Sequence, residues 1–181
     1  MKKIVALLLV VAMALSVTAC RRRGQDETPT QQQAKNLHGT MEENVSKIMQ
    51  ANPVEFMGGL IPVDLQDTSE EGLWTLKSMT GLDSADRLKD VAVYEPMTGS
   101  QAFSLVLVRV KDASQAKTVA KEMRENIDPR KWICATADQV MTAGYGDTVL
   151  FIMLDHQLGV TAQSFVDAFA NVCGGELDFV D

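Results

Sequence analysis

Residues 102–110 place the strongest constraint on the fold of this chain. They read Ala-Phe-Ser-Leu-Val-Leu-Val-Arg-Val, a nearly continuous apolar run with many β-branched side chains. A run of this kind suits a strand in the middle of a sheet, where little of its surface meets water. The fold is therefore expected to contain a sheet built around this strand, with partners supplied by neighbouring segments.

Three further strands are predicted from the apolar pattern, at residues 91–97, 132–142 and 148–154. Short turns at residues 98–100 and 144–147 join the strands in pairs, which favours antiparallel hairpins. An amphipathic helix is predicted after each pair, beginning at Asp112 and at Thr161. Two earlier helices are predicted from capping boxes at residues 40–43 and 68–71.

Together these elements predict a single α+β domain over residues 40–181. Its four-stranded, mainly antiparallel sheet would consist of two strand–strand–helix units, with the helices packed on one face and two N-terminal helices in front. The two units share a pattern but no residues, so an internal duplication is a hypothesis only. The total of 181 residues suits one modest domain.

The first 19 residues have the three parts of a secretory signal peptide. Lys2 and Lys3 precede an apolar run at residues 4–15, and small residues follow it. The run is about 12 residues long, whereas a membrane-spanning helix needs roughly 20. Val-Thr-Ala-Cys at residues 17–20 resembles the lipobox of bacterial lipoproteins, in which the cysteine receives a lipid and becomes the first mature residue. We therefore expect cleavage before Cys20 and its lipidation; a plain signal peptide cut at Ala19 and an uncleaved anchor are the alternatives.

Residues 20–39 are predicted to form the lipidated cysteine and a flexible polar tether. Leu37 is the one large apolar residue of the stretch 24–39, which is too little to form a core. Five of the 17 basic residues precede Gly24, so the remainder carries 12 basic against 24 acidic residues, a net charge of −12. This acidic balance argues against a nucleic-acid partner, because phosphate binding requires a basic surface.

The sequence contains no catalytic, metal-binding or cofactor-binding motif. Asp155 and His156, together with Asp147 of the last hairpin, are the candidates for a hydrolase site, since a carboxylate can hold a general base. The prediction is nevertheless no catalytic residue, no metal and no cofactor. One acidic group fits a solvated loop and helix start, with a weak calcium site as the alternative: Asp64, Asp67, Glu70 and Glu71.

Three aromatic residues are candidate partner-binding residues, because exposed aromatic side chains often anchor interfaces: Trp74, Tyr94 and Tyr145. For Trp74 and Tyr145, packing onto a neighbouring helix is the favoured interpretation. If the strand at residues 91–97 lies at an open sheet edge, it could also accept a guest strand. Cys134 and Cys173 are expected to be buried free thiols, with a disulfide between them as the alternative.

Several of these features together resemble a family of small Gram-positive lipoproteins that is known only as a domain of unknown function. The resemblance covers about residues 40–173 and rests on the lipobox, the polar tether and three short segments: residues 80–82 (Thr-Gly-Leu), 94–97 (Tyr-Glu-Pro-Met) and 106–111. It implies the α+β fold and the location. Its motifs are packing patterns, so it implies no functional residue.

The expected function is that of a lipoprotein anchored at the outer face of the cell membrane. The domain would be a non-enzymatic binding or accessory module of the cell envelope, and its partner would be an envelope protein, a peptide or a small ligand. An envelope hydrolase with a site near Asp155 and His156 is the alternative function. A purely structural role in the envelope is not distinguished from binding by the sequence.

Overall fold

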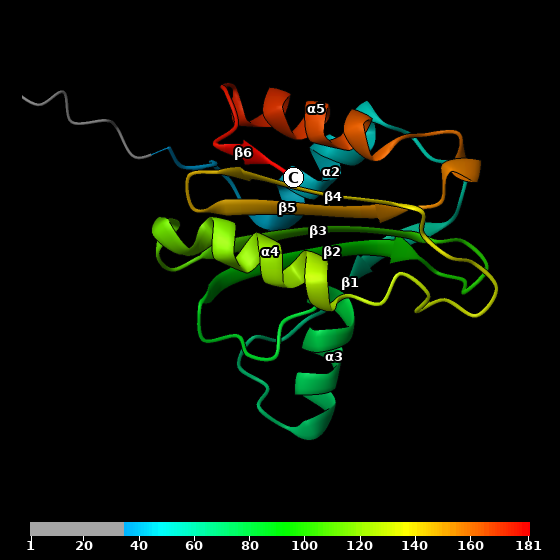
Figure 1. Ribbon diagram of the computed structural model, residues 1–181, viewed down its shortest axis with the longest axis horizontal. Coiled ribbons are helices and arrows are strands. Elements are labelled where there is room, and N and C mark those ends of the chain that lie inside the picture. The colour runs from blue at the N-terminus through cyan, green and yellow to red at the C-terminus, as the bar shows by residue number, and fades with distance from the viewer. Residues whose placement is uncertain (1–34) are drawn as a thin grey trace, which may run out of the picture. The chain divides into compact units, whose positions relative to one another are not determined.

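A computed structural model describes residues 35–181 of the chain (Figure 1). The predicted signal peptide, Cys20 and most of the predicted tether lie outside these residues. The described part is an α+β domain, as expected. Its main elements are β1 (Gly58–Ile61), β2 (Leu88–Pro96), β3 (Phe103–Val110), β4 (Gln139–Tyr145), β5 (Thr148–Leu154), β6 (Phe179–Val180), α2 (Met41–Ala51), α3 (Glu70–Thr80), α4 (Ala116–Asn126) and α5 (Ala162–Cys173).

The six strands form one open antiparallel sheet in the order β1-β2-β3-β5-β4-β6. The two most apolar strands, β3 and β5, lie at its centre and pair along their whole length, from Phe103 opposite Leu154 to Arg109 opposite Thr148. Every residue of β5 is buried, and so is every residue of β3 except Arg109. The expectation that residues 102–110 form a central strand is therefore confirmed.

The prediction of four strands is wrong, because two short edge strands were missed. β1 has four residues, two of them glycines, and β6 has only two residues, so neither shows an apolar alternation. Their pairing with β2 and with β4 defines them as strands. Because β1 lies between α2 and α3, these two helices do not follow one another directly, and the prediction of two helices in front of the sheet is wrong for the described residues.

Helices cover both faces of the sheet, so the prediction of helices on one face is wrong (Figure 1). One core contains α3 and α4 with Val106 and Val108 of β3. The other contains α2 and α5 with Leu105 and Leu107 of the same strand. Successive side chains of a strand point to opposite faces, so a continuously apolar strand requires cover on both sides.

The placement of the helices also argues against an internal duplication. The helix that follows the β2–β3 hairpin, α4, packs on β4 and β5 instead of on its own hairpin. The helix that follows the β4–β5 hairpin, α5, packs on the same two strands from the opposite face. α4 and α5 therefore do not occupy equivalent positions relative to the hairpins that precede them, whereas the helices of a duplicated unit would.

Local capping signals are borne out more closely than strand bounds. Thr40 and Glu43 form the predicted capping box of α2, whereas Ser69, one residue after the predicted start, caps α3. The predicted strand at residues 132–142 begins only at Gln139. The irregular segment before it is held by an ion pair between Lys131 and Glu95, whose side chains are only 12% and 9% exposed.

Candidate functional site

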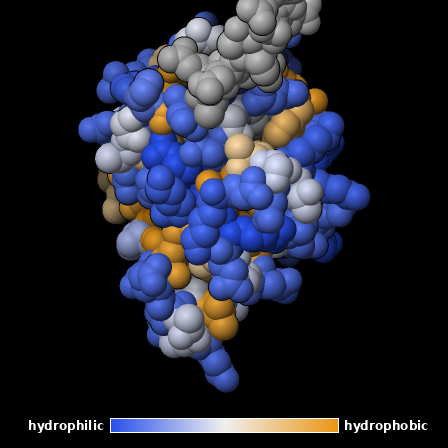
Figure 2. All heavy atoms as spheres, turned by 90° about the vertical axis from the view of Figure 1, so that its left-hand side faces the viewer, coloured by the Kyte–Doolittle hydropathy of each residue, from blue (hydrophilic) through white to orange (hydrophobic). Residues whose placement is uncertain are grey.

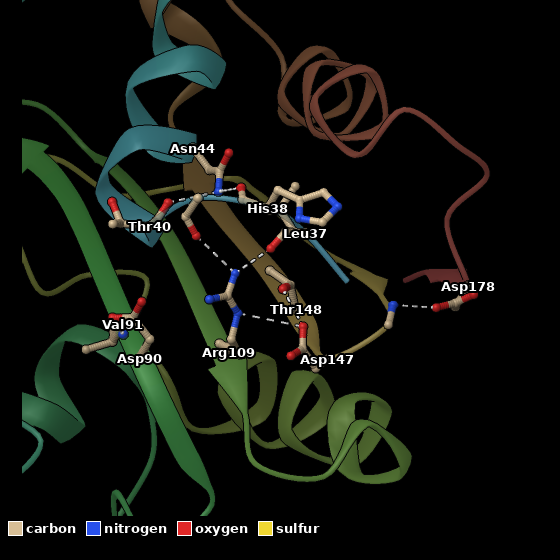
Figure 3. A network of polar contacts seen from close by, with 12 residues as sticks. Leu37, His38, Thr40, Asn44, Asp90, Val91, Arg109, Asp147, Thr148 and Asp178 are labelled. Carbon is tan, nitrogen blue, oxygen red and sulfur yellow. Dashed lines mark hydrogen bonds and ion pairs between the residues drawn. The ribbon is translucent and has the colours of Figure 1, made fainter. Parts of the chain in front are cut away.

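Residues 35–39, which the sequence analysis placed in the tether, form a strap against the domain. The strap lies where β3 ends and β5 begins (Figure 3). Leu37 is only 6% exposed and packs in the core between the sheet and α2 and α5. Arg109 Nη2 donates hydrogen bonds to the carbonyl oxygens of Leu37 at 2.6 Å and Gly39 at 3.3 Å. The packed domain thus includes residues 35–39 as well as 40–181.

Arg109 connects the strap to the β4–β5 turn. Its Nε lies 3.7 Å from Asp147 Oδ1, and both side chains are largely buried. The hydroxyl of Thr148 donates to the same carboxylate oxygen at 3.0 Å. A buried guanidinium requires acceptors for its N–H groups. Asp147 and the strap carbonyls supply them, so the strap contributes to satisfying this buried charge.

Lys35, at the start of the described residues, is held by the opposite side of the same turn. Its Nζ donates to Asp178 Oδ1 at 2.7 Å and to the Glu176 carbonyl at 2.9 Å. The other Asp178 oxygen accepts the Gly146 N–H at 2.7 Å. Partial burial opposes ionisation of Asp178, but the hydrogen bonds from Lys35 and Gly146 outweigh it and lower its pKa. The chain before residue 35 therefore joins the domain at this end.

The two ends of the sheet differ in character. Hydrophilic side chains dominate the view onto the strap end, with separate hydrophobic patches between them (Figure 2). Three large apolar side chains are exposed on loops at the opposite end, which we call the far end: Met57 is 76% exposed, Met97 71% and Ile133 90%. The Met97 N–H donates to the Met57 carbonyl, and Ile133 packs against Gly99, so these loops are neighbours.

The three candidate partner-binding residues do not form one surface. Tyr94 is half-buried in β2 and makes an edge-on contact with Phe103. Tyr145, also half-buried, lies at the strap end with Lys35 Nζ 5.4 Å from its ring centre. Trp74 alone is open, 68% exposed on α3. The structure thus favours packing for the two tyrosines and leaves Trp74 as an exposed aromatic residue.

The edge of β2 is less open than a guest strand requires. β1 already pairs with β2 from Val93 to Pro96. In the part of β2 that β1 does not cover, the Val91 N–H donates to the carboxylate of Asp90 (Figure 3). This N–H is therefore not available to pair with a guest strand. β1 itself is four residues long and is followed directly by Pro62, which cannot donate a ladder hydrogen bond.

The three residues considered for a hydrolase lie at opposite ends of the sheet. Asp147 precedes β5 and Asp155 and His156 follow it, a separation of about 25 Å for a strand of this length. The sequence analysis missed the partner of His156. Its ring Nδ1 bonds to Asp138, 18 positions earlier, whose pKa is lowered by this bond. Asp155 Oδ1 lies farther away, at 3.5 Å.

Two groups of side chains offer the ligand types that a metal ion binds. Asp138, Asp155 and His156 each offer one ligand atom within 4.8 Å of the others, although both Asp138 and His156 are exposed. In the predicted acidic group, Asp64 and Asp67 accept backbone N–H groups two residues ahead. Such local turns explain those two carboxylates without a cation.

The two cysteines of the described residues are free, as predicted, which excludes a disulfide between them in this structure. Cys134 is exposed, contrary to the prediction of burial, because residues 132–138 form a loop instead of the first half of a strand. Cys173 is half-buried at the end of α5, and burial raises the pKa of its thiol to about 12.

An open cleft of about 660 Å³ runs between α4 and strand β4, a size that suits a small ligand. We call it the α4 cleft. Basic side chains of α4 form most of one wall, and β4 and the chain after β6 supply the other. Its lining residues are Lys117, Thr118, Lys121, Arg124, Glu125, Thr142 and Asp181.

Comparisons with protein-family models, with curated proteins and with solved structures found no match to this chain. In the part that the structure describes, no helix combines the length and the apolar character that crossing a bilayer requires.

Proposed function

We propose that this chain is a lipoprotein anchored through Cys20 at the outer face of the cell membrane. We further propose that its domain binds an envelope protein without catalysing a reaction. The observation that carries the proposal is the strap. It fixes the point at which the N-terminal segment joins the domain, by Arg109 on one side and by Asp178 on the other.

Because the N-terminal segment joins the domain at the strap end, a lipid on Cys20 would favour one orientation of the domain relative to the membrane. The strap end would face the lipid surface, and its hydrophilic character is suited to that position (Figure 2). The far end, about 25 Å away along β3, would face outward with Met57, Met97 and Ile133 exposed. Exposed apolar side chains that gather at one end of a domain are typical of protein contacts.

Cys20→Ala tests the anchor. We expect the wild-type protein in the membrane fraction of cells, and the variant either unprocessed or released, because the lipid would be absent. If the variant is processed at the same rate and stays equally membrane-bound, the lipoprotein assignment is wrong.

Site-specific photo-crosslinking in intact cells tests the partner and the direction together. A crosslinking residue at position 133 probes the far end, and one at the exposed position 176 probes the strap end. We expect a single envelope protein to be captured from position 133 and not from position 176. Capture from 176 alone, or equal capture from both, would contradict the proposed direction. No capture from either position would contradict a protein partner.

An envelope hydrolase is the alternative proposal, and one observation favours it. Asp138 holds His156 through Nδ1, which leaves Nε2 of an exposed imidazole as a potential base. The purified chain would then hydrolyse activated esters in a manner abolished by His156→Ala. Equal rates for the variant and the wild type would rule out this site.

A further inference from the structure

The floor of the α4 cleft contains a polar group without a partner. Thr142 is 1% exposed, and its hydroxyl oxygen has no hydrogen-bond partner within the described structure. Its backbone is satisfied, since its N–H and carbonyl both bond to Asp181. Buried hydroxyl groups are normally hydrogen-bonded, and leaving one unpaired costs free energy. An unused donor therefore lies beneath the floor of the cleft, on the side of the sheet that faces α4.

Three cationic side chains line the wall opposite this hydroxyl. Lys117, Lys121 and Arg124 are spaced three and four residues apart, so they project from one face of the helix. Lys121 has a loose ion pair with Glu125 at 3.7 Å. The stretch from residue 24 onward carries a net charge of −12, which makes a basic wall unusual for this chain.

We propose that the α4 cleft binds a phosphodiester group. Glu125 and Asp181 also line the cleft, and Asp181, the last residue of the sequence, has a terminal carboxylate besides its side chain, so three positive charges meet three negative ones. That balance suits a monoanion better than a polyanion. The cations would neutralise the phosphoryl oxygens. The Thr142 hydroxyl is covered in the free protein and would donate to one of these oxygens once the side chains at the cleft floor move aside. The same chemistry occurs in a phospholipid headgroup and in a soluble phosphodiester.

Titration of the full-length chain in neutral detergent tests the site, with dimethyl phosphate as the probe and sodium chloride at equal ionic strength as the reference. We expect dimethyl phosphate to raise the unfolding temperature in a saturable manner. Replacing Lys117, Lys121 and Arg124 together by Gln should abolish this rise. The matched control replaces Lys47, Lys77 and Arg130 by Gln, which changes the net charge equally on other surfaces. Equal losses in both triple variants would overturn the proposal.

Thr142→Val separates a ligand role from a structural one. The substitution removes the unpaired hydroxyl at nearly constant volume, so we expect the free protein to unfold at a higher temperature and to bind the probe about tenfold more weakly. Ser104 carries the other buried hydroxyl without a partner and does not line the cleft. Ser104→Ala should leave probe affinity unchanged. Unchanged affinity in Thr142→Val would remove this residue from the site and overturn the proposed geometry.

Reconstitution of the full-length chain distinguishes the two sources of the phosphodiester. Vesicles of phosphatidylglycerol and phosphatidylcholine are compared with vesicles of phosphatidylcholine alone. A rise in unfolding temperature that requires phosphatidylglycerol and the three cleft cations would support a headgroup ligand. A response to dimethyl phosphate without a response to phosphatidylglycerol would support a soluble ligand. No cation-dependent response to either probe would overturn the proposal.

Discussion

Gly146→Ala is the sharpest test of the strap. Gly146 lies in the β4–β5 turn with a φ of +57°, and an added Cβ would lie 1.6 Å from the carbonyl oxygen of Lys35. That atom is backbone, so no side-chain rotation relieves the overlap. The turn is fixed by its neighbouring strands, and the strap is therefore the part that has to move.

The expected cost follows from what the strap loses. The left-handed conformation costs an alanine about 1 kcal/mol. Releasing Leu37 gives up about 2 kcal/mol of apolar burial, and the Arg109 bonds to strap carbonyls are worth about 1.5 kcal/mol. The freed backbone regains conformational entropy, which offsets much of this. We expect a loss of roughly 2–3 kcal/mol in the free energy of unfolding, of which about 1 kcal/mol is the strain common to any such position.

Gly159→Ala is the matched control, because Gly159 has a φ of +74° but no atom within 4 Å of an added Cβ. Urea unfolding should show a smaller loss for this variant, from backbone strain alone. Trypsin cleavage after Lys35 should accelerate only in Gly146→Ala, since only that change releases the strap. Equal stability of the two variants and unchanged cleavage after Lys35 would refute the reasoning.

Three further outcomes are expected from buried or paired groups. Glu95→Gln should lower the free energy of unfolding by about 3 kcal/mol in urea titrations, because it leaves the largely buried Lys131 ammonium without a counter-charge. The pKa of Asp138 is lowered from 3.8 by its bond to His156, so this bond stabilises the fold above pH 3.8 and ceases to do so as pH falls through the lowered value. Acid unfolding of Asp138→Asn should accordingly show a shallower loss of stability below pH 4 than the wild type. At pH 8, a thiol reagent should label exposed Cys134 rapidly and Cys173 slowly, since the Cys173 thiol, with a pKa of about 12, is almost wholly protonated.

Helix starts and central strands were predictable because their signals are local. The capping box at Thr40 involves residues three apart, and the apolar runs of β3 and β5 announce their own burial. These continuous apolar runs have apolar side chains on both faces of the sheet, so they also indicate helices on both faces. The prediction of helices on one face did not take this into account. β1 and β6 have no such signal, because their definition as strands depends on partners elsewhere in the chain.

The candidate sites were less predictable than the fold. In the sequence His156 follows Asp155, but its partner for the close Nδ1 contact, Asp138, is 18 residues earlier. Leu37 is a lone large apolar residue in a polar stretch, and nothing within that stretch indicates the apolar core in which it packs. Thr142 has an ordinary position in a strand, and only the packing of α4 beside it leaves its hydroxyl unpaired.

The sequence by itself determined the α+β class, the central position of residues 102–110, the main helix starts and the expectation of a lipid anchor. Each depends on composition or on spacing within a few turns of chain. Tertiary structure alone decided the strand order, the side of the sheet on which each helix lies, the strap and the α4 cleft. These features join residues far apart in the chain, such as Lys35 with Asp178, and the energy of such contacts depends on geometry that no local pattern records.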